Sequence, residues 1–590
     1  MSAAAAGAAP LSRHGGPGGF NGFSGRWSPT GAHSAAHSAA GPVVDFHGEL
    51  YNTDELCQWL ALPPPTPAAV LVAAAWQRAQ VDGLLRLDGV FALALRSPEG
   101  LLLYRDPSSL FNLVWHAQGT GETLQVGFAT HLDTLLCLPG TPRRLSRRSL
   151  HEYLRFLDIA APHTLYEDLH AVEPGQLLRW TRAGGPTASR PEGTGASAPP
   201  ANFDEAVDRV DALLQAGVRA RLAGVPRAAA FLSGGIDSSL LCAIAARQRD
   251  DVTAVTVGFD GAAFDETPVA HRIANHLGLR HEVLRFDHPQ VLQAFAALAR
   301  GLEQPMADPA MPATLLAYGH CREHYDAVLD GMGADEAVGA MPPRHVRLAV
   351  GAASHIPRPL RAALTRGLRA LPGARGYAPI VDFEHPADTM IRWKGFTRPE
   401  IEALCGEPVS FADTQFYRTF TRFPLSLGNG AHFERYSALL DAMPCDRLNQ
   451  ALQLTGATMR FPFWDRATDR GIRELRTDFR HQPGEPKRIL RALLARYVPS
   501  RIWDLPKHSF DFPLNDFLMA DDHAVLRRHL APERWQAHGL LSPAGVWRCA
   551  ERYIAGERQL VFRVWALALL GAWLEQRPGF EVGDSRTPKP

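Results

Sequence analysis

The chain has 590 residues, and its 61 basic and 61 acidic side chains give a formal net charge of +0. With no excess of either sign, there is no global field that attracts nucleic acid or an anionic membrane. The length exceeds what one hydrophobic core supports and predicts two or three domains. The seven cysteines are dispersed, with no Cys-x-x-Cys pair, which favours a reducing cytoplasm.

The first part of the chain predicts a leader and an α+β domain. Residues 1–40 form a flexible low-complexity leader without the basic flank and long apolar run of a secretory signal, and residues 20–27 within it predict a first strand. Residues 41–181 alternate short apolar runs with turns, which predicts a mainly antiparallel sheet. The expected strands are 43–48, 89–95, 100–104 and 123–129, and the expected helices are 53–60 and 66–80.

The second part predicts a different architecture. Residues 182–200 are rich in Gly, Pro, Ser, Thr and Ala and are expected to form a linker. In residues 201–590, three apolar runs alternate with helical stretches, as in a parallel, doubly wound sheet. These runs are 228–232, 252–259 and 326–330. From about residue 380 the pattern is helical, and the apolar segment 560–574 is too short for a membrane span, so it predicts a buried core helix.

The most informative stretch is residues 228–242. An apolar run ends in Ser233-Gly-Gly-Ile-Asp-Ser238 and continues as a second, Ala-rich run, which predicts a strand, a glycine turn and the start of a helix. Gly234 and Gly235 permit positive φ angles and close approach of a ligand. Successive N–H groups and the positive helix end suit an anion such as pyrophosphate. Asp237 fits beside phosphates only with a divalent cation between them, so the motif also implies Mg²⁺.

This loop matches the pyrophosphate loop of ATP pyrophosphatases, which split ATP into AMP and pyrophosphate, and it is not a Walker loop. Five further stretches make nearly the whole chain resemble the asparagine synthetase superfamily. They are Val255-Thr-Val-Gly-Phe-Asp260 with Asp265-Glu266, Asp308-Pro-Ala-Met-Pro312, Leu329-Asp-Gly-Met-Gly-Ala-Asp-Glu336, Met459-Arg-Phe-Pro-Phe-Trp-Asp465 and Arg501-Ile-Trp-Asp-Leu-Pro-Lys507. The resemblance implies two domains: a degenerate N-terminal nucleophile (Ntn) glutaminase-like sandwich, and an ATP-pyrophosphatase (PP-loop, adenine nucleotide alpha hydrolase-like) synthetase domain with a parallel sheet and a helical C-terminal part.

The resemblance also implies a site for ATP and Mg²⁺. Asp237 and Asp335 are expected to hold Mg²⁺, and Lys507 is expected to stabilise developing charge. The residues expected to bind ATP or its pyrophosphate are Ser233, Gly234, Gly235, Asp237, Ser238, Val257, Asp330 and Gly331. Structural alternatives stay open for some of them: Asp335 and Glu336 could cap a helix, and Lys507 could be a surface lysine.

Three other residues have open interpretations. Lys487, in Glu485-Pro-Lys-Arg-Ile-Leu-Arg491, is expected at a helix start or on the phosphate side rather than as a catalyst. Glu266 and His281 are candidates for substrate contact, with surface roles as the alternative.

The N-terminal half resembles the family's glutaminase domain in its overall motifs but not in its catalytic residues. Phe46-His-Gly-Glu-Leu-Tyr-Asn52 stands where Phe-Asn-Gly-Glu-Ile-Tyr-Asn is usual, so His47 replaces the asparagine that helps to hold the oxyanion. A glutaminase of this type needs a cysteine directly after the initiator methionine, with its own α-amine as base, but this chain has Ser2 there. Cys57 falls in a predicted helix and is expected to be a core residue. The glutaminase is therefore predicted to be inactive.

The part of the pattern that shapes the aspartate pocket has also changed. Asp446-Arg-Leu-Asn-Gln-Ala451 replaces Asp-Arg-x-Ser-Met-Ala, and Asp330 and Met332 replace a serine and an acidic residue. The activation motifs are kept, so the resemblance implies amide formation through an acyl-adenylate with an amine already carried by the substrate. Of the branches that work this way, the chain is most similar to the macrolactam synthetases (cyclases) of lasso peptides, ribosomally made antibiotics. The expected partners are then a precursor peptide, a leader peptidase and a leader-binding protein, with no nucleic acid and no membrane.

Alternatives remain from the same and other classes. A β-lactam-synthetase-like enzyme or an ammonia-dependent asparagine synthetase would use the same activation chemistry. A non-catalytic ATP-binding relative is a third possibility, and a tRNA-modifying pyrophosphatase, which shares the loop, is disfavoured by the zero net charge and the absence of basic tracts.

Overall fold

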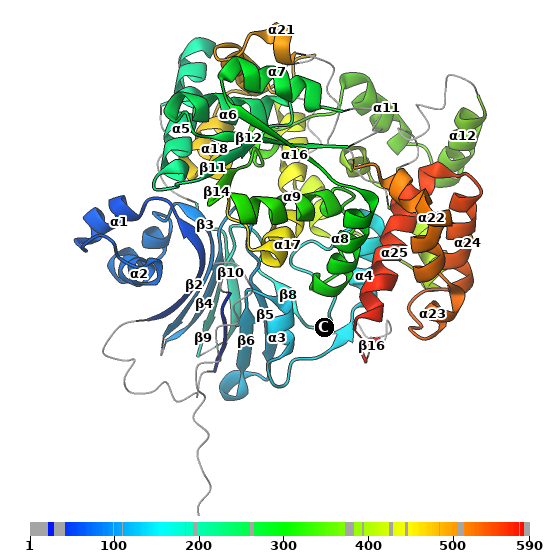
Figure 1. The fold of residues 1–590 in the computed structure, drawn as a ribbon. Helices are drawn as coiled ribbons and strands as arrows, with labels where there is room; N and C mark the ends of the chain where they lie inside the picture. The colour runs from blue at the N-terminus through cyan, green and yellow to red at the C-terminus, as the bar shows by residue number, and fades with distance from the viewer. Residues whose placement is uncertain are drawn as a thin grey trace, which may run out of the picture.

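The computed structural model describes residues 22–28, 42–97, 99–108, 110–182, 184–192, 198–259, 265–371, 381, 383–391, 395–423, 429–442, 446–482, 484–504, 512–577 and 579–582. Two antiparallel sheets form the N-terminal part, and a parallel sheet flanked by helices forms the part above it in Figure 1. A group of C-terminal helices lies beside both, at the right of the same view.

The N-terminal domain is a sandwich of two antiparallel sheets. One has the strand order β1-β6-β5-β8 and the other β10-β9-β4-β3-β2. Their bounds are β1 (Ser24–Trp27), β2 (Val43–Leu50), β3 (Gly89–Ser97), β4 (Gly100–Arg105), β5 (Val114–Gln118), β6 (Gln125–Ala129), β8 (His170–Ala171), β9 (Leu177–Thr181) and β10 (Gly184–Ser189). Trp115 of β5 meets Trp180 of β9 edge to face, with ring centroids 5.1 Å apart, so the two sheets pack directly on each other.

Alternation along β3 explains why this sheet is covered on both faces. Val90, Ala92 and Ala94 join the core between the sheets, whereas Phe91 and Leu93 join a second core beneath two helices. Those helices are α1 (Thr53–Leu60) and α2 (Ala68–Leu84). On the other side of the sandwich, α3 (Leu132–Leu136) contacts β5 and β6, and α4 (Arg147–Phe156) follows after the short strand β7 (Arg144–Leu145).

The second domain is built on a five-stranded sheet of order β13-β12-β11-β14-β15 in which every neighbouring pair is parallel. Its strands are β11 (Ala228–Phe231), β12 (Thr253–Gly258), β13 (Arg280–Arg285), β14 (Ala327–Leu329) and β15 (Met459–Arg460). Ala228 and Ala230 face one helical layer, and Ala229 faces the other, so the sheet is buried on both sides.

Helices make up most of the remainder. Around the parallel sheet lie α5 (Phe203–Leu222), α6 (Ile236–Gln248), α7 (Thr267–Leu277), α8 (His288–Gly301), α9 (Met311–His324), α10 (Ala334–Val338), α17 (Asp446–Thr455), α18 (Arg466–Arg473), α19 (Thr477–Arg480), α20 (Arg488–Ala495) and α21 (Ser500–Trp503). The others are α11 (Arg344–Ser354), α12 (Arg358–Ala370), α14 (Arg398–Cys405), α15 (Gln415–Arg422), α16 (Asn429–Asp441), α22 (Leu514–His529), α23 (Pro532–Gln536), α24 (Pro543–Ile554) and α25 (Val561–Glu575).

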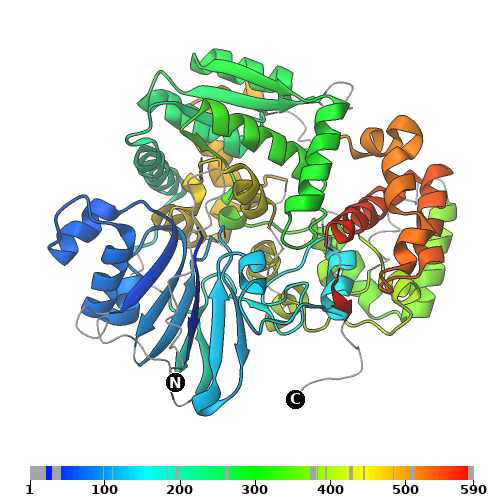
Figure 2. The same cartoon turned by 60° about the horizontal axis from the view of Figure 1, so that its bottom comes forward.

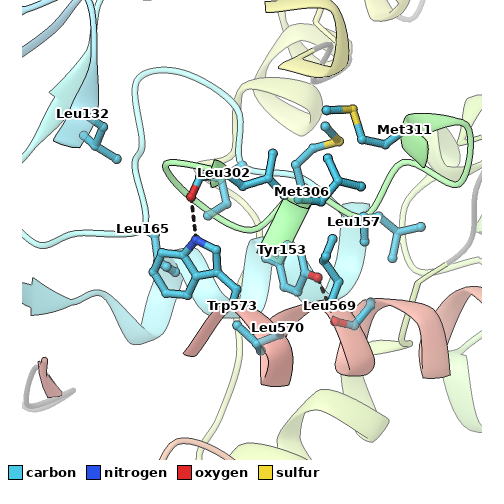
Figure 3. Packing of buried hydrophobic residues seen from close by; sticks show 14 of the residues in the cluster. Leu132, Tyr153, Leu157, Leu165, Leu302, Met306, Met311, Leu569, Leu570 and Trp573 are labelled. Atoms are coloured by element: carbon cyan, nitrogen blue, oxygen red, sulfur yellow. Dashed lines mark hydrogen bonds between the residues drawn. The ribbon is translucent and has the colours of Figure 1, made fainter. Parts of the chain in front are cut away.

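Helix α25 joins the two domains, which confirms the core helix expected at 560–574. In Figure 3, Trp573 donates to the carbonyl of Leu302 at 2.8 Å and lies near Leu165 of the N-terminal domain. Tyr153 of α4 is fully buried, and its hydroxyl donates to the carbonyl of Ala566 at 2.8 Å. Downstream, β16 (Glu581–Val582) pairs in parallel with β7, so the C-terminal part returns to the N-terminal domain (Figure 2). No helix among the described residues is long and apolar enough to cross a membrane.

Two sequence-based expectations need correction. Part of the expected linker, residues 182–200, is the strand β10, which pairs antiparallel with β9. All six residues of β10 are exposed, so its composition carries no burial signal. The expected pattern of parallel strands also omitted both edge strands of this sheet: β13, which carries charged residues, and the two-residue β15, in the part of the chain expected to be helical. The other domain boundaries stay predictions.

Candidate active site

The predicted pyrophosphate loop lies at the carboxyl end of β11. Gly234 has a φ of 77° and a Cβ there would stand 3.1 Å from the side chain of Val269, so glycine meets both a backbone and a space requirement. Gly235 is the N-cap of α6, whose positive end therefore opens into the loop. Ligands of open parallel sheets bind at these carboxyl ends.

Two serines hold the loop in shape. The Ser238 hydroxyl accepts the backbone N–H of Ser233 at 3.1 Å and lies 3.0 Å from the Ser233 hydroxyl. Ser233 Oγ in turn accepts the N–H of Gly235 at 3.3 Å. These bonds fix the curvature that turns successive N–H groups toward one concave side, as an anion requires.

The turn after β14 closes against this loop. Because β11 and β14 are parallel neighbours, their carboxyl ends meet at one edge of the sheet. A Cβ on Gly331 would stand 3.2 Å from the backbone nitrogen of Ser238 and 3.3 Å from Cβ of Asp237, so any side chain here would push the two segments slightly apart. Asp330, expected at the ATP site, accepts the Met332 N–H at 3.0 Å and the Tyr318 hydroxyl at 3.2 Å. Its carboxylate shapes the turn, and burial raises its pKa above the ordinary value.

The two carboxylates expected to hold Mg²⁺ converge on one point. The ammonium of Lys487 forms ion pairs with both of them: it contacts Asp237 Oδ2 and lies 2.7 Å from Asp335 Oδ1. Lys487 is the N-cap residue of α20 and has a left-handed backbone conformation, with a φ of 56°. Burial alone would lower its pKa, but the two carboxylates outweigh burial and raise it above the ordinary value.

This arrangement fits a divalent cation held jointly by protein and nucleotide. Asp237 and Asp335 supply hard oxygen ligands from two different elements, close enough to share one cation. No group of three or more His, Cys, Asp or Glu side chains with metal-binding geometry occurs in the part of the chain that the structure describes. Mg²⁺ commonly uses one or two carboxylates and completes its shell with substrate phosphates and water, which matches a site of two carboxylates.

The expectation that Lys487 begins a helix is confirmed, but its bridge between the two carboxylates was missed. One local feature indicated this bridge. A lysine at a helix N-terminus is unfavourable beside the positive end of the helix dipole, so it is expected to have acidic partners. Asp335, expected to be either a ligand or a helix cap, lies in the first turn of the short helix α10, and its side chain remains 57% exposed to solvent.

Two further expected residues relate to this edge of the sheet. Val257 lies near the end of β12, paired with Leu284 of β13. Lys507 lies outside the described residues, so its expected role stays a prediction. The first described residue after it is Phe512, whose ring meets Phe259, just beyond β12, edge to face at 5.6 Å.

Segments expected to shape the acyl pocket come together next to the turn after β14. Arg447, from the altered stretch 446–451, forms an ion pair with Asp308 at 3.4 Å. Asp308 also accepts the N–H of Ala310 at 2.8 Å, which fixes the start of α9. Arg447 acts electrostatically on buried Asp330, so the three charges belong to one polar cluster beside the pyrophosphate loop.

His281 is engaged inside the protein. Its Nε2 lies 2.8 Å from the hydroxyl of Thr256, which also donates to the carbonyl of Leu232 at 2.5 Å. His281 therefore supports the strand ends directly behind the loop. Glu266 is the N-cap residue of α7.

The N-terminal domain has a different interior at its candidate site. His47 is 4% exposed, and its ring lies edge to face against Phe111 at 4.5 Å and against His131 at 5.8 Å. Thr130 accepts the N–H of Phe23, just before β1, at 3.0 Å, and burial lowers the pKa of His131. Ser2 lies outside the described residues.

Cys57 is buried in α1, which confirms the expectation of a helical core residue.

The two domains are joined through their own motifs. Glu49 of β2 forms an ion pair with Arg460 of β15, with Arg460 Nε 3.2 Å from Glu49 Oε2. Arg221 of α5 lies over the ring of Tyr51 at 4.0 Å and donates to Asp465 at 3.0 Å. The stretches 46–52 and 459–465 therefore meet at the domain interface.

Comparisons with known proteins agree with this geometry. A family model described as asparagine synthase matches residues 209–575, and one described as a glutamine amidotransferase domain matches residues 29–189. A putative glutamine-hydrolyzing asparagine synthetase of Mycobacterium tuberculosis (strain ATCC 25618 / H37Rv) is 25% identical over 556 residues, which cover 90% of this chain and 84% of that protein. Glutamine-hydrolyzing asparagine synthetase 1 of Bacillus subtilis (strain 168) is 22% identical, with 90% and 85% covered.

A third relative has another product. The carboxyethyl-arginine beta-lactam-synthase of Streptomyces clavuligerus is 27% identical over 324 residues, which cover 53% of this chain and 59% of that protein. The asparagine synthase model alone spans well over half of the chain, on the part that carries the pyrophosphate loop and the converging carboxylates. This chain therefore belongs to the asparagine synthase family and is an ATP-dependent carbon–nitrogen ligase.

Proposed function

We propose that this ligase closes a macrolactam: an Asp or Glu side chain of a lasso precursor peptide is adenylated and then captured by the N-terminal amine of the same peptide. The observation that carries this proposal is the contrast between the two candidate sites. At the ATP site, the pyrophosphate loop, the turn after β14 and the carboxylates of Asp237 and Asp335 lie close together. In the glutaminase-like domain His47, which by resemblance replaces an oxyanion-holding asparagine, is packed against Phe111. An enzyme that keeps activation and gives up its glutamine site needs an amine from elsewhere.

The first step activates the acid. A carboxylate oxygen of the peptide attacks the α-phosphorus of ATP, the bond to the β-phosphate oxygen breaks, and pyrophosphate leaves. The product is a mixed anhydride of the acid with AMP. Negative charge gathers on the departing pyrophosphate, so the catalyst has to place positive charge and N–H donors there.

The chain offers three groups for this task. The N–H groups of the Ser233–Ser238 loop and the positive end of α6 face the expected pyrophosphate position. Asp237 and Asp335 would hold Mg²⁺, which when bound neutralises phosphate charge and orients the leaving group. Lys487, already between these carboxylates, would supply a further positive charge beside the phosphates, and Lys507 is proposed to stabilise charge during acyl transfer.

The second step forms the amide. The neutral α-amine attacks the acyl carbon, AMP departs, and the amine proton is lost to solvent or to the departing phosphate. An α-amine has a pKa of about 7.7–8.0, so a useful fraction is neutral near pH 7 and little base strength is needed. Holding amine and acyl carbon in contact is worth roughly 7–11 kcal/mol of the barrier, and the site must keep water from the anhydride.

Two related functions use the same activation. Similarity to the beta-lactam synthase supports a closure within a small molecule, and similarity to the asparagine synthetases supports amidation of aspartate. Incubation with aspartate, ATP and ammonium tests the second: formation of asparagine at rates above those with peptide would replace the macrolactam proposal. If the protein shows no ATP–pyrophosphate exchange with any of the candidate acids, it would instead be a non-catalytic ATP-binding relative.

The direct test combines the purified chain with a precursor peptide, a leader peptidase, a leader-binding protein, ATP and Mg²⁺. We expect a product lighter than the cleaved peptide by one water, with one AMP formed per product. Lys507→Ala should abolish product formation while the protein remains folded. Release of glutamate from glutamine coupled to AMP formation would contradict the proposal, because the N-terminal domain would then supply ammonia.

A further inference from the structure

One region exposes apolar side chains that a folded protein normally covers. Among the residues that the structure describes, five large apolar side chains are exposed, and four of them lie between residues 344 and 371. Three of these four, Leu360, Leu364 and Leu371, have exposed fractions of 62%, 44% and 58% and form what we call the leucine face; Leu348, 62% exposed, lies on the preceding helix α11. The fifth, Val70, lies alone on α2. Clustered exposure of this kind marks interaction sites, whereas single exposed residues are ordinary.

Helix α12 presents its apolar side outward. Residues 360, 364 and 371 are spaced by four and seven positions, which places them on one side of the helix. The buried side lies about 100° further round the helix: Arg361 lies over the ring of Phe383 at 4.3 Å, and Thr365 is 3% exposed. Helix α12 buries an arginine and a threonine but exposes leucines to solvent, which indicates that its leucines contact a binding partner.

The anchor of this helical pair does not use the leucine face. Val350 and Ala353 of α11 form a small core with Phe383. Arg358 forms an ion pair with Glu384 at 2.7 Å, which fixes the start of α12. Figure 1 shows α11 and α12 at the periphery of the molecule, with α12 at its outer edge. The leucine face can therefore be covered without disturbing the contacts that hold the two helices in place.

Charge restricts what can cover it. Residues 344–371 contain six arginines and no Asp or Glu, in a chain whose net charge is +0. Arg358 is paired with Glu384 and Arg361 is buried, but Arg344 and Arg366 are exposed. A second copy of the same face would bring like charges together, which opposes self-association. The occupant should be apolar on one side and acidic around it.

The composition of the face favours a protein helix over a lipid surface. Between the leucines the outward side of α12 carries Ala363, Gly367 and Ala370, all exposed, and small residues let another helix approach closely. Residues 344–371 contain no Trp, Tyr or Phe, although interfacial membrane helices commonly use Trp and Phe as anchors.

We propose that the leucine face is a docking surface for an acidic amphipathic helix of a partner protein. The partner's helix would place apolar side chains at i, i+4 and i+7 between the leucines of α12 and carboxylates toward the surrounding arginines. This inference does not depend on the amide that the enzyme forms, since α11 and α12 contribute no residue to the candidate active site.

The test uses a labelled helical peptide of about five turns, with leucines at i, i+4, i+7 and i+11 and glutamates on the flanks. Fluorescence anisotropy should show saturable binding to the whole protein, at least tenfold tighter than for a scrambled peptide or for one with lysines in place of the glutamates. The double variant Leu360→Ser/Leu364→Ser should weaken binding at least tenfold. Val70→Ser, a matched exposed apolar residue elsewhere, should leave it unchanged, and all variants should keep wild-type ATP–pyrophosphate exchange.

Several outcomes would overturn the proposal. The peptide would fail to bind, or would bind the double variant as well as the wild type. Co-sedimentation with phosphatidylserine vesicles that is lost in the double variant would assign the face to a membrane instead. A concentration-dependent dimer that the same variant abolishes would assign it to a second copy of the chain.

Discussion

The two domains of this chain keep their sheets but differ in what lies at the functional edge. At the carboxyl ends of β11 and β14, charged side chains from three separate elements meet, and Asp335 is still open to solvent. In the N-terminal sandwich the corresponding position holds His47, buried between aromatic rings. One edge can bind and release a charged ligand, and the other has become part of a packed interior.

The contacts between the two domains give the N-terminal sandwich a structural role. Glu49 and Tyr51, from the stretch that carries His47, hold Arg460 and Arg221 of the synthetase domain. Breaking one such partly buried contact leaves the remaining charge with less solvent and no partner, which costs more than the contact contributes. The N-terminal sandwich therefore supports the synthetase domain whether or not it hydrolyses glutamine.

The largest effect should come from Asp237→Ala. Loss of this carboxylate removes a proposed Mg²⁺ ligand and leaves Lys487 facing Asp335 alone, so ATP–pyrophosphate exchange should fall about 1,000-fold. Asp54→Ala, an acidic residue in the first turn of α1, is the matched control and should change the rate less than twofold. If Asp237→Ala kept a tenth of the wild-type exchange rate, the two converging carboxylates would not be essential for ATP activation.

Lys487→Met should have the next largest effect. Its ammonium holds two carboxylates in one place, and without it they repel each other and the pyrophosphate loses a neighbouring cation. We expect the KM for ATP to rise and the exchange rate to fall about 100-fold. Lys487→Arg keeps the positive charge but places it on a planar guanidinium group of different length, so it should restore part of the exchange rate. Equal rates for Met, Arg and Lys at this position would show that the lysine only fills space.

How much of this site could be predicted depends on the range of the contacts. The strand, glycine turn and helix of residues 228–248 are local features, and the positive φ of Gly234 follows from the Gly-Gly pair. The sequence placed Asp237 and Asp335 correctly at strand ends, because parallel sheets gather such ends at one edge. The bridge by Lys487 was not predictable in this way, since it joins residues 250 positions apart.

Two strands that were not predicted, β10 and β13, lie at the edges of their sheets. Strand β13 reads Arg280-His-Glu-Val-Leu-Arg285, and its charges suit an edge strand rather than the apolar run that signals a buried one. Strand β10 has no buried residue and exists through its hydrogen bonds to β9. Strand β13 buries only Leu284 and β10 buries nothing, so neither has the apolar run that marks a buried strand.

Gly331→Ala tests the close approach of the two active-site segments. The new Cβ would stand 3.2 Å from a backbone nitrogen of the pyrophosphate loop, which cannot move without shifting Asp237. Exchange should fall about tenfold, with thermal stability nearly unchanged because the turn can relax. Gly319→Ala is the control: it lies inside α9 with nothing within 4 Å of the added methyl, so it should keep full activity and stabilise the helix slightly. Identical activities for the two variants would mean that the loop and the turn move independently.

The smallest expected effect concerns the N-terminal domain and leaves catalysis unchanged. Burial raises the pKa of Asp106 from 3.8 to about 6, although its carboxylate accepts the N–H groups of Phe91 and Ser108 at 2.9 and 2.8 Å. The folded domain thus binds this proton more tightly than the unfolded chain does. The stability contributed by the group is complete below pH 3.8 and is lost as the pH rises through 6, by up to about 3 kcal/mol.

Asp106→Asn removes this titration, while the loss of one acceptor oxygen costs the same at every pH. Relative to the wild type, the variant should therefore gain unfolding free energy as the pH rises from 4 to about 7. Urea unfolding followed by tryptophan fluorescence measures the difference, because Trp115 and Trp180 lie in the core of the same sandwich. A difference that stays constant across this range would place the Asp106 carboxylate in a solvated environment. ATP–pyrophosphate exchange of the folded variant should equal that of the wild type, which would separate the structural role of this domain from the chemistry of the other.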